Sequence, residues 1–160
     1  MLYRKIAVAA AVIAAGLVWN GAASAQLLDR KAISLAEAKK IVAAAEAEAT
    51  KNKWNVVIAV VDEGGNLILL HRMDDTQLGS VEVAQGKART SAMFRRPTKV
   101  FEDGVKGGRN VILNLTRDIT PIQGGVPVTV GGRAIGAVGV SGVTSEQDEQ
   151  IALAGASVVK

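Results

Sequence analysis

The sequence predicts an α+β fold: an antiparallel sheet of two β-hairpins flanked by helices, in the order α-ββ-αα-(β)-ββ-α, where the bracketed strand is the weakest element. Two observations lead to this prediction. A capped amphipathic segment precedes a pair of apolar runs, and each of two such pairs is joined by a turn with two consecutive glycines. Hairpins pair their strands antiparallel, unlike β-α-β crossovers, so a Rossmann sheet is not expected.

Residues 1–25 have the pattern of a secretory signal peptide. Two basic residues precede an apolar run over 6–19, and Ala23-Ser24-Ala25 is a small-x-small cleavage site. The run is shorter than the roughly 20 residues that a membrane-spanning helix needs. We therefore expect residues 26–160 to form a single exported domain, periplasmic or secreted, with no membrane span after cleavage.

The composition excludes several classes of function. The chain has 19 basic and 15 acidic residues, and two of the basic residues fall in the signal segment, so the exported domain carries a net charge of only +2. Together with the scarcity of aromatic residues, this gives no support to nucleic-acid binding. Cysteine is absent, which excludes thiolate catalysis, cysteine-ligated zinc and iron–sulfur clusters.

The first helix is predicted from Leu35 to about Lys51. Ser34 and Glu37 form a capping-box sequence, in which each side chain satisfies a backbone donor at the start of the helix. Apolar residues then recur at helical spacing, at Leu35, Ala38, Ile41, Val42, Ala45 and Ala49. The remaining positions are largely charged, so we expect one face of this helix to pack on a sheet.

A first hairpin is predicted from two apolar runs, over 55–62 and 67–72, with a turn over 63–66 that contains two glycines. Both runs are apolar on both faces. Strands of this kind are usually covered on each side, so we expect this hairpin to lie in the centre of the sheet.

The second half of the chain predicts two helices, a weak element, a second hairpin and a last helix. We expect Ser80 to cap the first of these helices, and Thr144 or Ser145 to cap the last. The segment at 111–120 is compatible with a strand or with an irregular crossing. The predicted ranges are 80–93, 98–105, 111–120, 126–130, 133–141 and 147–158.

The second hairpin is rich in small residues, which let a helix backbone or a flat ligand approach the sheet closely. Tight helix packing is the simpler of these two interpretations. A turn at Gly131-Gly132 places alternate residues on opposite faces: Ala134, Gly136, Val138 and Val140 on one, and Arg133, Ile135, Ala137 and Gly139 on the other.

His71 is the single histidine of the chain and comes at the end of the first hairpin. If that hairpin turns at its glycines, His71 lies opposite Ile58 and shares a face with Leu69, and with Met73 if the strand continues. An imidazole at a strand end is often a structural polar group. The alternative interpretation is a ligand or a general base at the edge of a pocket.

The residue types suit haem better than the other prosthetic groups or catalytic motifs considered. Haem needs an axial ligand, an apolar slot and cations for its propionates. The candidate axial ligands are His71, Met73 and Met93, and the candidate cations are Lys87, Arg89, Arg95 and Arg96. A second imidazole for zinc, a calcium-loop pattern, a Gly-x-Ser-x-Gly elbow and a P-loop lysine are all missing from the sequence.

Three segments resemble the GlcG/HbpS family, which includes the C-terminal domain of PduO-type proteins: "VVDEGGNLILLHRMDD", "AQGKARTSA" and "GGVPVTVGGRAIGAVGVSGVTSEQDEQIALAG". The similarity spans nearly all of the predicted exported domain. It implies an antiparallel sheet flanked by helices, assembly into dimers or larger rings, and haem binding in some members. Other members are connected with corrinoid metabolism or with glycolate utilisation.

The resemblance and the residue types together lead to a functional hypothesis. We expect an exported tetrapyrrole-binding protein, with His71 as axial ligand to haem iron, Met73 beside it, and Lys87 and Arg89 pairing with the propionates, in a homo-oligomer. One alternative is a lyase or isomerase acting on an organic acid, in which Asp74 or His71 moves protons and Arg72 or Arg89 holds a carboxylate. Another is a non-catalytic accessory subunit of a periplasmic oxidoreductase system.

Overall fold

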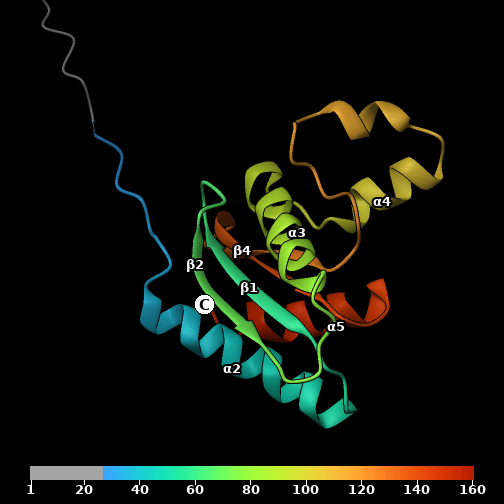
Figure 1. The fold of residues 1–160 in the computed structure, drawn as a ribbon. Helices are drawn as coiled ribbons and strands as arrows, with labels where there is room; N and C mark the ends of the chain where they lie inside the picture. Colours follow the sequence, from blue (N-terminus) through green and yellow to red (C-terminus); the bar gives the residue numbers. More distant parts are fainter. Residues whose placement is uncertain (1–26) are drawn as a thin grey trace, which may run out of the picture. The chain divides into compact units, whose positions relative to one another are not determined.

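The computed structural model describes residues 27–160, of which 31–160 form one compact unit. The expected signal peptide lies outside the described residues. Within them, the predicted α+β class is confirmed, with four α-helices and a four-stranded antiparallel sheet (Figure 1). The elements are α2 (Leu35–Asn52), β1 (Val57–Asp62), β2 (Leu67–Arg72), α3 (Ser80–Phe94), α4 (Lys99–Lys106), η1 (Asn110–Asn114), β3 (Gly125–Val130), β4 (Arg133–Ser141) and α5 (Ser145–Ala156).

The strand order is β2-β1-β4-β3, so the two hairpins meet at β1 and β4. The predicted register of the first hairpin is confirmed, since His71 pairs with Ile58, up to a bulge between Val60 and Val61. The expectation that the whole hairpin is central is wrong. β1 is central and its residues are almost completely buried, whereas β2 is an edge strand and is half-buried, because no strand follows it in the sheet.

The second hairpin also turns as predicted, but its face assignment needs one correction. A bulge between Val128 and Thr129 inserts an extra residue into β4, because Val128 pairs with Gly136 and Thr129 pairs with Ala134. Ile135 therefore joins Val138 in the core on the α2 side of the sheet, and not the opposite face predicted from simple alternation.

The helices cover both faces of the sheet (Figure 1). On one face, α2 and α5 pack over side chains of β1, β3 and β4. On the other face, α3 lies over β1 and β4 through a contact built from small residues. The first core contains Ile41, Ile58, Val60, Val128, Val138, Val140 and Ile151, and the second contains Val57, Ala59, Val61, Ala84, Ala88, Ala92 and Ala137.

The close contact between α3 and the sheet depends on Gly139. A Cβ atom at this position would lie 2.1 Å from the carbonyl oxygen of Ala84 and 2.4 Å from the amide nitrogen of Ala88. Both are backbone atoms of a helix and cannot move independently. The small residues of β4 therefore serve helix packing, which is the simpler of the two interpretations made from the sequence.

The caps are partly as predicted. Ser34 accepts a hydrogen bond from the Glu37 amide, and Thr144 forms a complete capping box with Gln147. Ser80 does not cap α3, because it is the first helical residue and Gly79 precedes it. Its hydroxyl instead accepts hydrogen bonds from Gln77 and from Ser141 of β4, which ties the helix start to the sheet.

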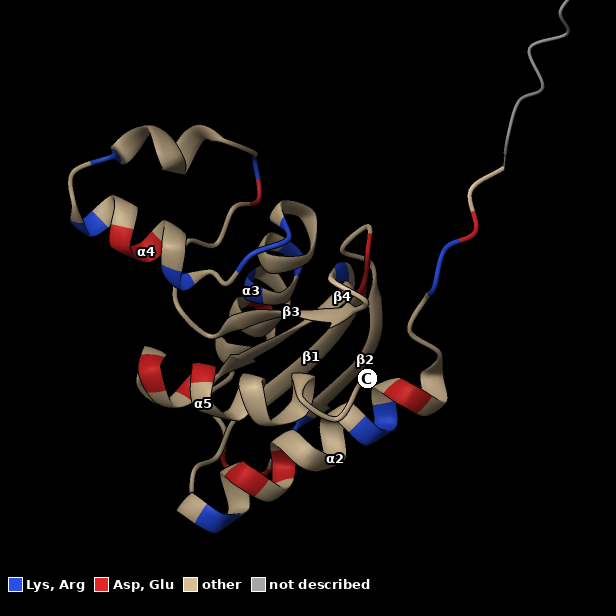
Figure 2. Ribbon diagram, turned by 180° about the vertical axis from the view of Figure 1, so that it is seen from behind, with Lys and Arg blue, Asp and Glu red and all other residues tan. Residues whose placement is uncertain are grey.

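The weakly predicted segment at 111–120 contains no strand. A single 3-10 helix, η1, occupies Asn110–Asn114, and irregular backbone follows. In Figures 1 and 2, α4 and the segment after it lie beyond α3, away from the strands.

A buried ion pair connects the helices on the two sides of the sheet. The Nζ atom of Lys87 in α3 lies 2.8 Å from Oδ2 of Asp148 in α5 and donates to the carbonyl oxygen of Val140, 2.9 Å away. Both side chains are almost fully buried, at 1% and 3% exposure. The pair passes Gly124, which directly precedes β3 and bonds to Val140 near the end of β4; a Cβ at Gly124 would lie 2.9 Å from Nζ.

The environment of Asp148 balances two opposing effects. Burial raises the pKa of this carboxyl above its ordinary value of 3.8, more than the Lys87 ammonium and the Val143 amide lower it. The first turn of α5 is acidic (Figure 2), and the helix N-terminus favours negative charge there. Lys87 is the largest of the influences that favour the carboxylate, so its removal leaves the buried Asp148 without its main stabilising partner.

We predict that Gly139→Ala destabilises the fold by about 2 kcal/mol or more, because the added methyl meets the α3 backbone. Gly79→Ala is the matched control, since nothing lies within 4 Å of its added Cβ. Urea unfolding should show a lower midpoint for Gly139→Ala than for the parent, and an unchanged midpoint for Gly79→Ala. Equal midpoints for the two would contradict the proposed packing.

We predict that Lys87→Met destabilises the fold by about 3–5 kcal/mol at pH 7, because it leaves a buried carboxylate without its cation. A raised folded-state pKa favours the folded state below the unfolded pKa, and this benefit is lost as pH rises through the folded pKa. The loss of folding stability in Lys87→Met should therefore become smaller as the pH is lowered and Asp148 becomes neutral.

The control is Lys99→Met, which breaks the exposed pair between Lys99 and Asp103 and should change stability by less than about 1 kcal/mol. Urea unfolding at pH 7 and pH 4.5 measures both variants. A Lys87→Met deficit that is independent of pH, or as small as that of the control, would show that the pair does not stabilise the fold.

Candidate functional site

His71 lies at the end of edge strand β2, on the sheet face that α2 covers. Its Nε2 atom is 3.4 Å from Oε1 of Glu46 on α2, and its side chain is 36% exposed. Solvent can therefore reach the ring, and the carboxylate can orient it. The ring is neither sealed in the core nor detached from the fold.

Met73 lies next to His71, as predicted. Its amide donates to the carbonyl oxygen of Val56, which extends the pairing one residue beyond β2, and its side chain packs on the core beneath α2. A hollow of about 520 Å³ runs along the outer side of α2, lined by Ala43, Glu46, Ala47, Thr50 and Lys51. Glu46 thus lies between this hollow and the imidazole.

Lys87 and Arg89 do not join His71 within one chain. Both belong to α3, on the opposite face of the sheet. The Lys87 ammonium is held in the buried pair with Asp148, so it is not placed to bind a propionate. Arg89 is exposed and donates from Nε to the Gly65 carbonyl in the β1–β2 turn, at the other end of β2 from His71.

The arrangement expected for an organic-acid enzyme is not formed by the described residues. That hypothesis needs a histidine, a carboxylate and an arginine converging in one closed pocket. His71 has a carboxylate neighbour, Glu46, whereas Arg89 is on the opposite face. Asp74 and Arg72 are both exposed on the segment around the end of β2.

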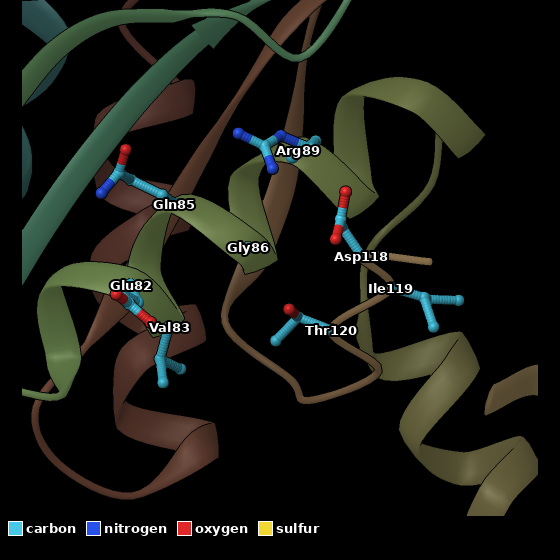
Figure 3. Close-up of a pocket in the computed structure, with 8 residues that line it drawn as sticks. All are labelled: Glu82, Val83, Gln85, Gly86, Arg89, Asp118, Ile119 and Thr120. Carbon is cyan, nitrogen blue, oxygen red and sulfur yellow. The ribbon is translucent and has the colours of Figure 1, made fainter. Parts of the chain in front are cut away.

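Arg89 instead borders an open cavity of about 440 Å³ between α3 and the loop at 118–120 (Figure 3). Figure 3 shows Asp118 extending from the loop toward the turn of α3 that carries Arg89. The loop approaches α3 at Gly86, where a Cβ would lie 2.2 Å from the Thr120 hydroxyl, and the Thr120 amide donates to Thr90.

Sequence reasoning did not foresee this cavity, because its two walls are about thirty residues apart and the loop has no regular pattern. Two carboxylates, of Glu82 and Asp118, and the guanidinium of Arg89 line the same opening. The cavity can accept a polar ligand, but its openness and mixed charge favour no particular class.

A smaller and more apolar hollow, of about 270 Å³, lies between the end of α3, α4 and η1. It contains both phenylalanines of the chain and two arginines. The lining residues are Phe94, Arg96, Val100, Phe101, Arg109, Ile112 and Leu115. Arg96 is one of the candidate cations predicted from the sequence, but no sequence pattern places it beside Arg109.

Buried Glu102 joins α4 to the segment before β3. Its carboxylate accepts a hydrogen bond from the Gln123 amide and pairs with Lys106. Burial would raise the pKa of Glu102, but the bonds from Lys106 and Gln123 outweigh it and lower the pKa below 4.5. Glu102 is therefore ionised at neutral pH and holds α4 in place.

Within residues 27–160, no group of three or more histidine, aspartate or glutamate side chains is placed to hold a metal ion. No helix in this range is long and apolar enough to cross a membrane.

The chain is similar to several known proteins. It is 49% identical to the protein GlcG of Escherichia coli K12 over 104 residues, which cover 65% of this chain and 77% of GlcG. Its structure is similar to that of a double mutant of HbpS from Streptomyces reticuli, with a TM-score of 0.78 at 30% identity, covering 88% of this chain and 95% of the other.

A second solved structure that is similar is a complex of PduOC with haem. It has a TM-score of 0.75 and 28% identity, and the match covers 81% of this chain and 96% of that one. The predicted fold is therefore found in related solved structures, and one of these contains haem.

Residues 33–157 match the family described as "Haem degrading protein HbpS-like", which confirms the resemblance noted from the sequence. The match covers both hairpins and all the helices from α2 to α5. This chain belongs to the HbpS-like family.

Proposed function

We propose that this chain is an exported haem-binding protein that holds the tetrapyrrole beside His71, in a groove between copies of the chain. The observation that carries the proposal is the haem complex of a structure that shares this fold at 28% identity. Family membership supports it, since the family is named for haem degradation.

The residues around His71 fit one part of this proposal. A haem site needs an accessible nitrogen ligand beside apolar surface. The ring is partly exposed, and Met73 and Leu69 pack on the same side of the sheet. With a proton on Nε2, Glu46 can accept it, and Nδ1 keeps the lone pair that binds metal.

The residues proposed for the propionates fit less well within one chain. Their positions are the reason for proposing that haem binds between two copies. Lys87 leaves the proposed set because its ammonium is already bound in the interior. Arg89 stays in it, because its side chain is exposed, but it cannot reach His71 of its own chain. A propionate at His71 would then pair with Arg89 from a second copy.

This division gives each side chain a role. His71 binds the haem iron, Glu46 orients the imidazole ring and fixes its tautomer, and Met73 excludes water from one side of the haem site. When bound, haem would supply iron for one-electron or oxygen chemistry. The unpaired edge of β2 offers backbone groups to a second copy next to His71.

We predict that the protein titrated with haem shows a shifted Soret band, and that His71→Ala weakens binding at least tenfold and changes the spectrum. Glu46→Gln should weaken it less, and Arg89→Gln should weaken it without moving the band, because neither residue is an iron ligand. Absorption titrations measure all four proteins.

Met93→Ala is the matched control, because Met93 is an exposed candidate ligand on α3. It should leave the affinity and the band unchanged. If the protein gives no Soret shift, the haem proposal is wrong. If His71→Ala binds haem as the parent does, the ligand assignment is wrong.

We also propose export through residues 1–25, on the strength of the charge, apolar and cleavage-site pattern. When the whole chain is expressed in a bacterium with a periplasm, mass spectrometry should find a periplasmic product that begins at Gln26. Ala25→Phe should block cleavage and leave the precursor, because the processing site accepts only small residues. An uncleaved parent chain in the cytoplasm would refute export.

A further inference from the structure

The hollow between α4 and η1 is a defined cavity with a structural cause. Ile112 of η1 packs directly over Gly104 of α4, where a Cβ would lie 2.4 Å from the Ile112 Cδ1 atom. The absence of a side chain at Gly104 lets η1 approach α4 closely. The two elements then enclose the hollow together with Phe94, at the end of α3.

Aromatic rings and one arginine form a preorganised wall. The rings of Phe94 and Phe101 meet edge to face, with centroids 5.1 Å apart. The Arg96 guanidinium lies 5.9 Å from the Phe101 centroid, and its Nε donates to the Phe94 carbonyl oxygen at 3.1 Å. Two contacts therefore fix the Arg96 side chain while its terminal nitrogens remain available.

The charge of the hollow is not compensated. Arg96 and Arg109 both line it, and no acidic residue does. The nearest acidic residues along α4 are already paired, Asp103 with Lys99 and Glu102 with Lys106. Two cations beside an apolar cavity favour a ligand that combines a carboxylate with an apolar body, because the guanidinium fork matches carboxylate geometry.

The size and the rim restrict the ligand further. A volume of about 270 Å³ is below the roughly 300–1,000 Å³ typical of pockets for drug-sized ligands, so the ligand is smaller than a tetrapyrrole. Two of the apolar lining residues, Val100 and Leu115, are half-exposed, which is typical of a binding surface.

We propose that this hollow binds a small aromatic or aliphatic carboxylate, with the apolar body against Phe94, Phe101 and Ile112 and the carboxylate on Arg96 and Arg109. The site is separate from His71 and does not depend on haem binding. It gives the protein a second ligand class, recognised by charge and apolar surface together.

The test uses 1-naphthoate as the probe and 1-naphthamide as its neutral counterpart, in calorimetric titrations of the protein comprising residues 26–160. We expect naphthoate to bind with a submillimolar Kd and naphthamide to bind at least tenfold more weakly. Arg96→Gln and Arg109→Gln should each weaken naphthoate binding about tenfold, which is the loss expected for one charge-assisted contact.

Arg117→Gln is the matched control, because Arg117 is an exposed arginine of the next loop and does not line the hollow. It should bind naphthoate as the parent does, and so should His71→Ala. Thermal unfolding confirms that each variant is folded. Equal affinity for the two probes, or unchanged binding in both Arg96→Gln and Arg109→Gln, overturns the proposal.

A third result would also overturn it. If naphthoate fails to bind while Arg109→Gln dissociates an oligomer in sedimentation, the hollow is covered by a second copy of the chain and is not a ligand site.

Discussion

The buried pair of Lys87 and Asp148 is the interaction on which the arrangement of layers depends. Sheets in α+β domains usually hold their covering helices by apolar contact alone, and here α3 meets the sheet through alanines and glycines that bury little area each. The charge-assisted bonds of Lys87 to Asp148 and to the Val140 carbonyl add stability that this small apolar contact does not provide. It fixes α3 against α5, so the cavities that border α3 have a stable wall.

Much of the fold could be predicted because its signals are local. Paired apolar runs and double-glycine turns predicted both hairpins, and helix caps predicted where α2 and α5 begin. Counting residues across the first turn predicted the pairing of His71 with Ile58. The errors have two physical causes. Which strand lies at the edge depends on the long-range pairing of β1 with β4, which no local pattern encodes. The bulge that turns Ile135 to the other face lies within the β3–β4 hairpin, and simple alternation of residues does not reveal it.

The site was less predictable for the same reason. His71 and Met73 were correctly placed together because they are neighbours on one strand. Lys87 looked like a free cation, because its partner is sixty-one positions away and nothing near it in sequence signals burial. The apolar hollow between α4 and η1 was not predicted, because the sequence of this segment has no regular pattern and Arg96 and Arg109 come to line one hollow only in the folded chain.

The central claim is that the imidazole of His71 is the haem ligand. Because the chain has one histidine, labelling with ¹⁵N-histidine gives the resonances of this ring alone. On addition of ferric haem, direct ligation predicts that the ring nitrogen signals broaden beyond detection or move far outside the diamagnetic range. Ring signals that stay sharp and unshifted at saturating haem would contradict the account.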